Sequence, residues 1–208
     1  LRKPTAGTIR LAGQDVTGHS PRMMNEDAVA YVPADRHRFG LILSFPLADN
    51  LVLTSYYRSP YARGIVRDPR AILRDAVTSI ERYDIRTPSA TVRASTLSGG
   101  NQQKAVVARE FDRDLKLLVL DQPTRGLDVG SIEFIHRQVI AKRDAGTAVL
   151  LVSAELDEVL EMSDRIGVMF EGRIVAIVDG RTADKNAVGL LMATGGEERP
   201  PVPAAATA

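Results

Sequence analysis

Residues 97–104 read LSGGNQQK, and residues 105–111 read AVVAREF. In the first stretch, the hydroxyl of Ser98 is followed by two glycines, Gly99 and Gly100. The second stretch has the spacing of an amphipathic helix. The sequence therefore predicts a helix whose first turn presents a hydroxyl and backbone N–H groups. Such a terminus carries the positive end of the helix dipole and attracts phosphate, and glycines let a ligand approach the backbone closely.

Residues 117–121 read LLVLD, an apolar run that ends in Asp121, and residues 122–128 read QPTRGLD. A short apolar run of this kind is typical of a buried strand. In open α/β sheets, ligands bind beyond the carboxyl ends of the strands. The carboxylate of Asp121 is therefore predicted to lie at a ligand-binding edge.

These segments resemble three motifs of the nucleotide-binding domain of ABC transporters, in the order and spacing of that family. LSGGNQQK resembles the signature, LLVLD the Walker B strand, and TRGLD (124–128) the D-loop. YVPADR (31–36) and SAELDEVLEMSDRI (153–166) resemble the branch that imports simple sugars and nucleosides. The resemblance covers about residues 1–195. It implies an α/β fold of the P-loop NTPase (RecA-like) type, a parallel sheet with an inserted helical subdomain.

The resemblance also implies a division of the chain into parts. Residues 1–39 and 113–195 are expected to form the ATPase core. Residues 40–112 are expected to form the helical subdomain, which ends in the signature and docks on membrane permease loops. Residues 196–208 are rich in proline and alanine, and we expect them to be a disordered tail.

The phosphate-cradling loop of this family, G-x-x-x-x-G-K-[ST], does not occur in these residues, because none of the 16 glycines is followed by lysine. Leu1–Gly7 resembles the segment that follows the Walker A helix. We therefore expect the Walker A strand and helix to be missing, the alternative being that the protein never had them. A missing strand is expected to leave a gap beside residues 117–121. On its own, the 208-residue chain is expected to bind ATP weakly and to lack ATPase activity.

Three positions bear on hydrolysis. By the resemblance, Asp121 holds Mg²⁺ through water beside bound ATP. Gln122 stands where the family has a Glu that polarises the attacking water, and an amide cannot accept a proton. Ala154 stands where the family has a His that contacts the γ-phosphate. The branch usually also has an acidic residue at Ala34. We therefore expect this half to have a degenerate hydrolysis site.

The signature face, by contrast, is intact. In ABC dimers this face completes the site whose Walker motifs belong to the other half, and Asp128 is expected to couple the two sites. The residues expected to contact the partner's nucleotide are Ser98, Gly99, Gly100, Asn101 and Gln102.

The chain thus resembles the C-terminal half of a tandem importer ATPase that supplies its signature in trans. The expected partners are the N-terminal ATPase half of the same protein, transmembrane permease subunits and, indirectly, a substrate-binding protein. By the same resemblance, we expect the protein to be a peripheral subunit at the cytoplasmic face of the plasma (inner) membrane. The sequence QPTRGLDVG (122–130), with Gln122 in place of Glu, favours nucleosides over simple sugars as the transported substrate.

Composition limits the other functions. The net charge is +1, so no strong field favours nucleic acid, and cysteine is absent, which removes disulfides and thiolate chemistry. The three histidines lack metal-ligand spacing. Two alternatives remain. A DNA-repair or chromosome ATPase lobe would need long heptads before Leu97, which are absent. An inactive ABC-type scaffold module would have no permease partner.

The remaining segments alternate between apolar strands and helices, which predicts a parallel sheet covered on both faces. The pair Asp68-Pro69, a capping residue followed by proline, is expected to open a helix at 69–83. In that helix, one apolar stripe is expected to face the core, formed by Ile72, Leu73, Ala76, Val77 and Ile80. Strands are expected at 8–12, 28–32, 147–152, 165–170 and 174–178, and helices at 69–83, 129–143, 155–162 and 184–192.

Overall fold

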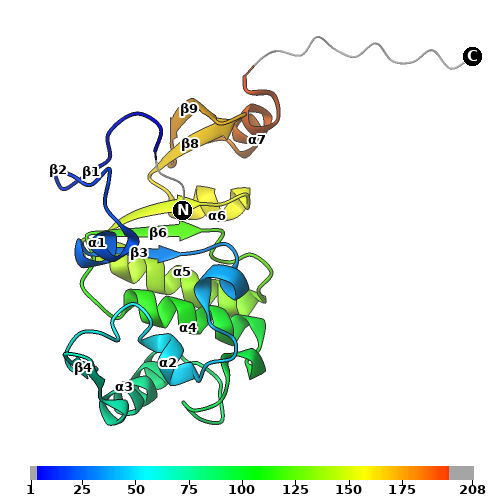
Figure 1. The fold of residues 1–208 in the computed structure, drawn as a ribbon. Coiled ribbons are helices and arrows are strands. Elements are labelled where there is room, and N and C mark those ends of the chain that lie inside the picture. Colours follow the sequence, from blue (N-terminus) through cyan, green and yellow to red (C-terminus); the bar gives the residue numbers. More distant parts are fainter. Residues whose placement is uncertain (1–3, 197–208) are drawn as a thin grey trace, which may run out of the picture. The chain divides into compact units, whose positions relative to one another are not determined.

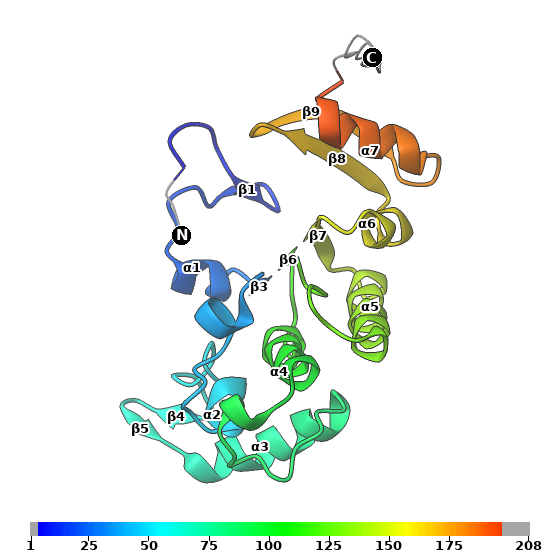
Figure 2. The same cartoon turned by 90° about the vertical axis from the view of Figure 1, so that its right-hand side faces the viewer.

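The computed structural model describes residues 4–196 (Figures 1 and 2). The chain forms two compact units, Leu1–Val152 and Ser153–Ala208. The tail expected at 196–208 lies, apart from Gly196, outside the described residues. No helix within the described range is both long enough and apolar enough to cross a membrane.

A three-stranded parallel sheet organises the first unit. Its order is β3 (Val29–Val32), β6 (Leu117–Asp121) and β7 (Ala148–Val152), which confirms the three strands predicted in these segments. Because β6 is hydrogen-bonded to a strand on each side, the prediction of a gap beside residues 117–121 is wrong. The unpaired edges of this sheet are the outer edges of β3 and β7.

The two faces of this sheet differ. Leu118 and Leu120 are fully buried, and helices α4 (Gly99–Phe111) and α5 (Val129–Asp144) pack on that side (Figure 1). On the other face, Leu150 and Val152 are 52% and 49% exposed. The prediction of a sheet covered on both faces is therefore wrong at β7, whereas Val29 of β3, on the same face, is buried, and α1 (Pro21–Glu26) contacts that strand.

Helix α4 begins at the predicted position, but it is not amphipathic. Every residue from Gln102 to Phe111 is buried, because the helix contacts β3, α2 (Leu47–Leu51), α3 (Pro69–Arg82) and α5. Its polar residues are paired inside the protein. The ammonium of Lys104, for example, donates to the carbonyl and carboxylate of Asp84 at 2.8 and 2.7 Å.

The segment between β3 and α4 contains α2 and α3. Asp68 caps α3 by accepting from the N–H groups of Arg70 and Ala71, as the Asp-Pro pattern predicts. The predicted stripe is only partly core, since Leu73 and Val77 are 40% and 49% exposed. The side of α3 that packs against α2 and α4 is instead the side of its buried residues Ala71, Ile72, Ala76 and Ser79.

Short elements complete the first unit. The predicted strand at 8–12 is reduced to β1 (Arg10–Leu11), and Ile9 just before it is 50% exposed. The other short elements are β2 (Gln14–Asp15), α1 (Pro21–Glu26), η1 (Arg36–Gly40), β4 (Ala62–Arg63), β5 (Val66–Arg67) and η2 (Ala94–Thr96).

The second unit is an antiparallel hairpin with two helices. It contains α6 (Leu156–Met162), β8 (Arg165–Phe170), β9 (Arg173–Asp179) and α7 (Lys185–Thr194). The sequence predicts these four elements, but the expectation that the strands join a parallel sheet is wrong for β8 and β9, which pair antiparallel in a sheet of their own. Its small core is formed by Ile166, Val168 and Val188.

Candidate functional site

The N-terminal end of α4 is open to solvent. We call Ser98, Gly99 and Gly100 the signature tip. Ser98 is exposed, and its hydroxyl caps the helix by accepting from Asn101, from the backbone N–H at 3.4 Å and from Nδ2 at 2.9 Å. The first N–H groups of a helix have no carbonyl partner within the helix. The signature tip therefore has the form of an anion-binding helix terminus, as the sequence predicts.

Both glycines of the tip make room for neighbouring side chains. A Cβ on Gly99 would lie 2.8 Å from Nη2 of Arg36. A Cβ on Gly100 would lie within 3.0 Å of the Ser131 hydroxyl and 3.1 Å from Oδ2 of Asp128. The missing side chains thus allow a guanidinium and the start of α5 to approach the tip.

The other two predicted signature contacts are already engaged within the chain. Gln102 is 5% exposed, and its Nε2 donates to the carbonyl of Ala94 at 3.1 Å. Its Oε1 therefore accepts from Nε2 of His37, at 2.8 Å. Oδ1 of Asn101 accepts from the N–H of Arg86 at 2.8 Å. These two amides hold the base of the tip in place.

Asp121 lies at the carboxyl end of β6, as predicted. The hydroxyl of Tyr31 on β3 donates to its Oδ2 at 3.2 Å. Burial and the neighbouring Asp121 carboxylate together raise the pKa of Tyr31, so its hydroxyl stays protonated and donates. Within the described residues, no group of three or more His, Cys, Asp or Glu side chains could hold a metal ion.

This donor set fits Mg²⁺ but not a metal held by protein ligands alone. Mg²⁺ usually binds through one or two carboxylates and keeps the phosphates of a nucleotide and water as its other ligands. Asp121 supplies one such carboxylate, and no described cluster supplies a protein cage.

Gln122 follows Asp121 in a strained conformation. Its φ is 49°, in the left-handed region that side chains other than glycine rarely adopt. Two contacts fix the segment there. The Gln122 N–H donates to the carbonyl of Val152 at 2.8 Å, and Nε2 of Gln103 donates to the carbonyl of Pro123 at 2.8 Å. Such strain is often found at functional sites.

Asp128 caps α5. Its carboxylate accepts from the N–H of Ser131 at 3.0 Å and from its hydroxyl at 2.8 Å, and these two bonds lower its pKa. A role between two nucleotide sites stays a prediction for this residue. Ala154 is exposed at the beginning of the second unit, two residues after β7.

Sequence reasoning did not single out Tyr31 or the position of Arg36 beside the tip. Nη1 of Arg36 donates to the carbonyl of Arg125 at 3.5 Å, while its Nε is buried without a hydrogen-bond partner. Asp35 fixes this segment by accepting from the N–H groups of His37 and Arg38. The sequence did contain one hint for Tyr31. It is the one residue with a hydroxyl in the strand 29–32, and a charged loop follows that strand.

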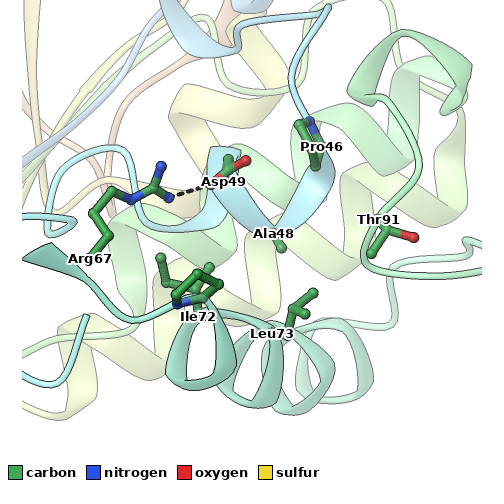
Figure 3. A pocket seen from close by; sticks show the side chains of 8 residues that line it. Pro46, Ala48, Asp49, Arg67, Ile72, Leu73 and Thr91 are labelled. Carbon is green, nitrogen blue, oxygen red and sulfur yellow. Dashed lines mark hydrogen bonds and ion pairs between the residues drawn. The ribbon is translucent and has the colours of Figure 1, made fainter. Parts of the chain in front are cut away.

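A separate groove lies between α2 and α3, with a cavity of about 280 Å³ (Figure 3). An ion pair between Asp49 and Arg67 spans one side of it. The exposed Leu73 on α3 contributes to its apolar lining. The residues that line it are Pro46, Ala48, Asp49, Arg67, Pro69, Ile72, Leu73 and Thr91.

Comparison with known proteins gives one consistent result. Residues 1–125 match the family model described as ABC transporter. The chain is 49% identical over 193 residues to the guanosine import ATP-binding protein NupO of Bacillus subtilis (strain 168), covering 93% of this chain and 38% of that protein. It is 47% identical over 195 residues to the nucleoside import ATP-binding protein NupA of Lactococcus lactis subsp. cremoris (strain MG1363), covering 94% of this chain and 38% of that protein.

Solved structures agree on the fold. The dimeric structure of MJ0796, a bacterial ABC transporter cassette, is similar with a TM-score of 0.71 at 20% identity, covering 88% of this chain and 77% of that chain. The chain spans only 38% of the length of NupO and NupA.

Proposed function

The chain belongs to the ABC transporter family, and from this premise we propose that it is the ATP-binding part of an importer for nucleosides. The names of NupO and NupA, the relatives that are 49% and 47% identical, support nucleosides as the substrate class. A glucose importer of Haloferax volcanii is 38% identical, and a ribose importer of Yersinia pestis is 41% identical. Simple sugars are therefore the second candidate class.

In this proposal, the signature tip completes a nucleotide site whose phosphate loop belongs to another ATPase half. The supporting observation is that Ser98 is exposed at the end of a helix that is otherwise buried. A helix N-terminus stabilises phosphate through its N–H groups and its dipole. The guanidinium of Arg36 beside Gly99 adds positive charge at the same place.

The chain's own hydrolysis site is proposed to be degenerate. Gln122 occupies the position that follows the Asp121 carboxylate, and Ala154 follows β7, where a polar side chain would be needed to reach phosphate. The amide of Gln122 cannot act as a general base, and the methyl group of Ala154 cannot donate to phosphate. Asp121 would bind Mg²⁺ together with ATP, and that ion would neutralise charge on the phosphates. The half that supplies catalysis would be the N-terminal half of the same protein.

We place permease docking on residues 40–112, the proposed helical subdomain. The groove between α2 and α3 is lined mostly by apolar residues, with the Asp49–Arg67 ion pair on one side, and its lining residue Leu73 is exposed. Exposed apolar side chains beside a groove are typical of a protein interaction surface. Permeases would then hold the protein at the cytoplasmic face of the membrane, and a substrate-binding protein would act indirectly through them.

Replacement of Ser98 by Arg in the full-length protein tests the signature role. The arginine side chain would fill the space above the tip and remove the Ser98 hydroxyl. We expect ATP turnover to fall more than about tenfold, because oriented donors to phosphate commonly contribute that much or more. Ser95→Arg is the matched control, since Ser95 is also exposed and lies three residues earlier. Equal turnover in the two variants would contradict the proposal.

A further inference from the structure

Tyr31 and Asp121 are neighbours on the open face of the sheet. Tyr31 is paired in register with Val119, and Asp121 lies two residues further along β6. Side chains two residues apart on a strand share a face. A tyrosine can span this diagonal, and its hydroxyl lies 3.2 Å from Oδ2 of Asp121.

The rest of this face offers Asp121 no other polar group. The register places aliphatic residues at every other position of the face in the three strands, so that Tyr31 and Asp121 are its only polar side chains. The aliphatic residues are Val29, Leu117, Val119, Ala148, Leu150 and Val152. The hydrogen bond from Tyr31 is therefore the one that a side chain of this sheet face can donate to orient the Asp121 carboxylate.

From this arrangement we infer that Tyr31 is a positioning residue for the Asp121 carboxylate. The inference rests on the proposed function, in which Asp121 holds Mg²⁺ beside ATP. The hydroxyl of Tyr31 donates to Oδ2, which leaves Oδ1 as the oxygen that would accept from metal-bound water. Carboxylates at metal sites are themselves held by hydrogen bonds, and loss of such a partner weakens metal binding about 10- to 100-fold. Tyr31 acts through Asp121 and contacts no substrate.

The test measures metal binding rather than turnover. The full-length protein is titrated with Mn²⁺ in the presence of ATP, and free Mn²⁺ is followed by electron paramagnetic resonance. Asp121→Asn identifies the Mn²⁺ that belongs to this site. We expect Tyr31→Phe to weaken binding of that Mn²⁺ about tenfold, at the lower end of the range for such partners, and to leave ATP binding in EDTA unchanged.

Tyr57→Phe is the matched control, because the hydroxyl of Tyr57 also donates to a carboxylate, that of Glu26, at 3.3 Å. This variant should bind Mn²⁺ as the wild type does. Two results would overturn the inference. If Asp121→Asn removes the Mn²⁺ but Tyr31→Phe binds it as the wild type does, Tyr31 does not position the carboxylate and the proposed function stands. If Asp121→Asn itself changes nothing, the proposed metal role of Asp121 fails as well.

Discussion

The hydroxyl of Ser131 lies where a side chain on Gly100 would have to be, because an added Cβ would come within 3.0 Å of it. Two helix N-termini meet at this point, those of α4 and α5. Both carry positive partial charge, which would make their approach unfavourable. The carboxylate of Asp128 lies between them, bonded to Ser131 and 3.1 Å from the position of a Gly100 Cβ. The negative charge of Asp128 therefore offsets the partial positive charge of both helix N-termini.

This crowding predicts the effect of Gly100→Ala. The new methyl group must displace the Ser131 hydroxyl and with it the Asp128 cap. Overpacking costs roughly 1–3 kcal/mol, against a helix-propensity gain of roughly 0.5–1 kcal/mol. We expect a net loss of about 1–2 kcal/mol in the free energy of unfolding, measured by urea denaturation.

Two further variants control for this prediction. Gly189→Ala in α7 should be neutral or stabilising, because its Cβ would have only an ordinary contact with Leu156 at 3.8 Å. Gly100→Ala combined with Ser131→Ala should lose less stability than the sum of the single changes, because the clashing atom is gone. Strict additivity would show that the two residues do not interact.

Tyr83, which ends α3, gives a prediction on alkaline stability. It is 1% exposed, and burial raises its pKa from 10.0 to about 12. The folded state therefore holds this proton more tightly than the unfolded state does. The resulting stability is complete below pH 10 and is lost as the pH rises to about 12, a change of roughly 3 kcal/mol.

Tyr83→Phe removes the titrating hydroxyl and keeps the ring. Its free energy of unfolding should therefore fall less between pH 10 and 12 than that of the wild type. Tyr56→Phe, at a tyrosine that is 48% exposed, should follow the wild-type curve. Parallel decline in all three proteins would mean that Tyr83 is not responsible.

The sequence predicted the parts of the fold that depend on local pattern. Apolar runs placed the three strands of the sheet, and the Asp68-Pro69 pair placed the start of α3, because both signals act between near neighbours. The Ser-Gly-Gly turn likewise placed the signature tip at the end of a helix. These features need no knowledge of the rest of the chain.

Features that depend on distant partners were not predicted. Helix α4 was expected to be amphipathic, but Lys104 is buried because Asp84 reaches it from the loop after α3. Leu73 fits the helical stripe, yet it is exposed because α2 and α4 cover a different side of α3. The bond from Tyr31 to Asp121 joins residues 90 positions apart, and only the register of β3 against β6 brings them together.

Leu73 provides a test of permease docking. Leu73→Asp places a charge on the apolar wall of the groove between α2 and α3, at a side chain that is 40% exposed, so folding should be little affected. We expect at least a roughly tenfold weaker association with the permease subunits, as for a charge placed in an interface core, with ATP binding unchanged. Co-purification from membranes and a thermal melt measure the two effects.

Leu190→Asp is the control for this variant, because Leu190 in α7 is a leucine that is 64% exposed outside the groove. It should co-purify with the permease as the wild type does. Equal loss of association in both variants would indicate a general effect of surface charge, and no loss in Leu73→Asp would remove the groove as the docking site.

The degenerate hydrolysis site is tested by restoring its residues one at a time. Ser98→Arg serves as the background, because it is expected to silence the partner's site and leave only turnover at Asp121. In that background, Gln122→Glu should raise phosphate release less than about threefold, since Ala154 still cannot donate to phosphate. Gln122→Glu together with Ala154→His should raise it about a hundredfold or more, the range that general-base catalysis provides. A strong increase from Gln122→Glu alone would mean that Ala154 is not a second defect, and no increase from the double variant would place the defect elsewhere in the site.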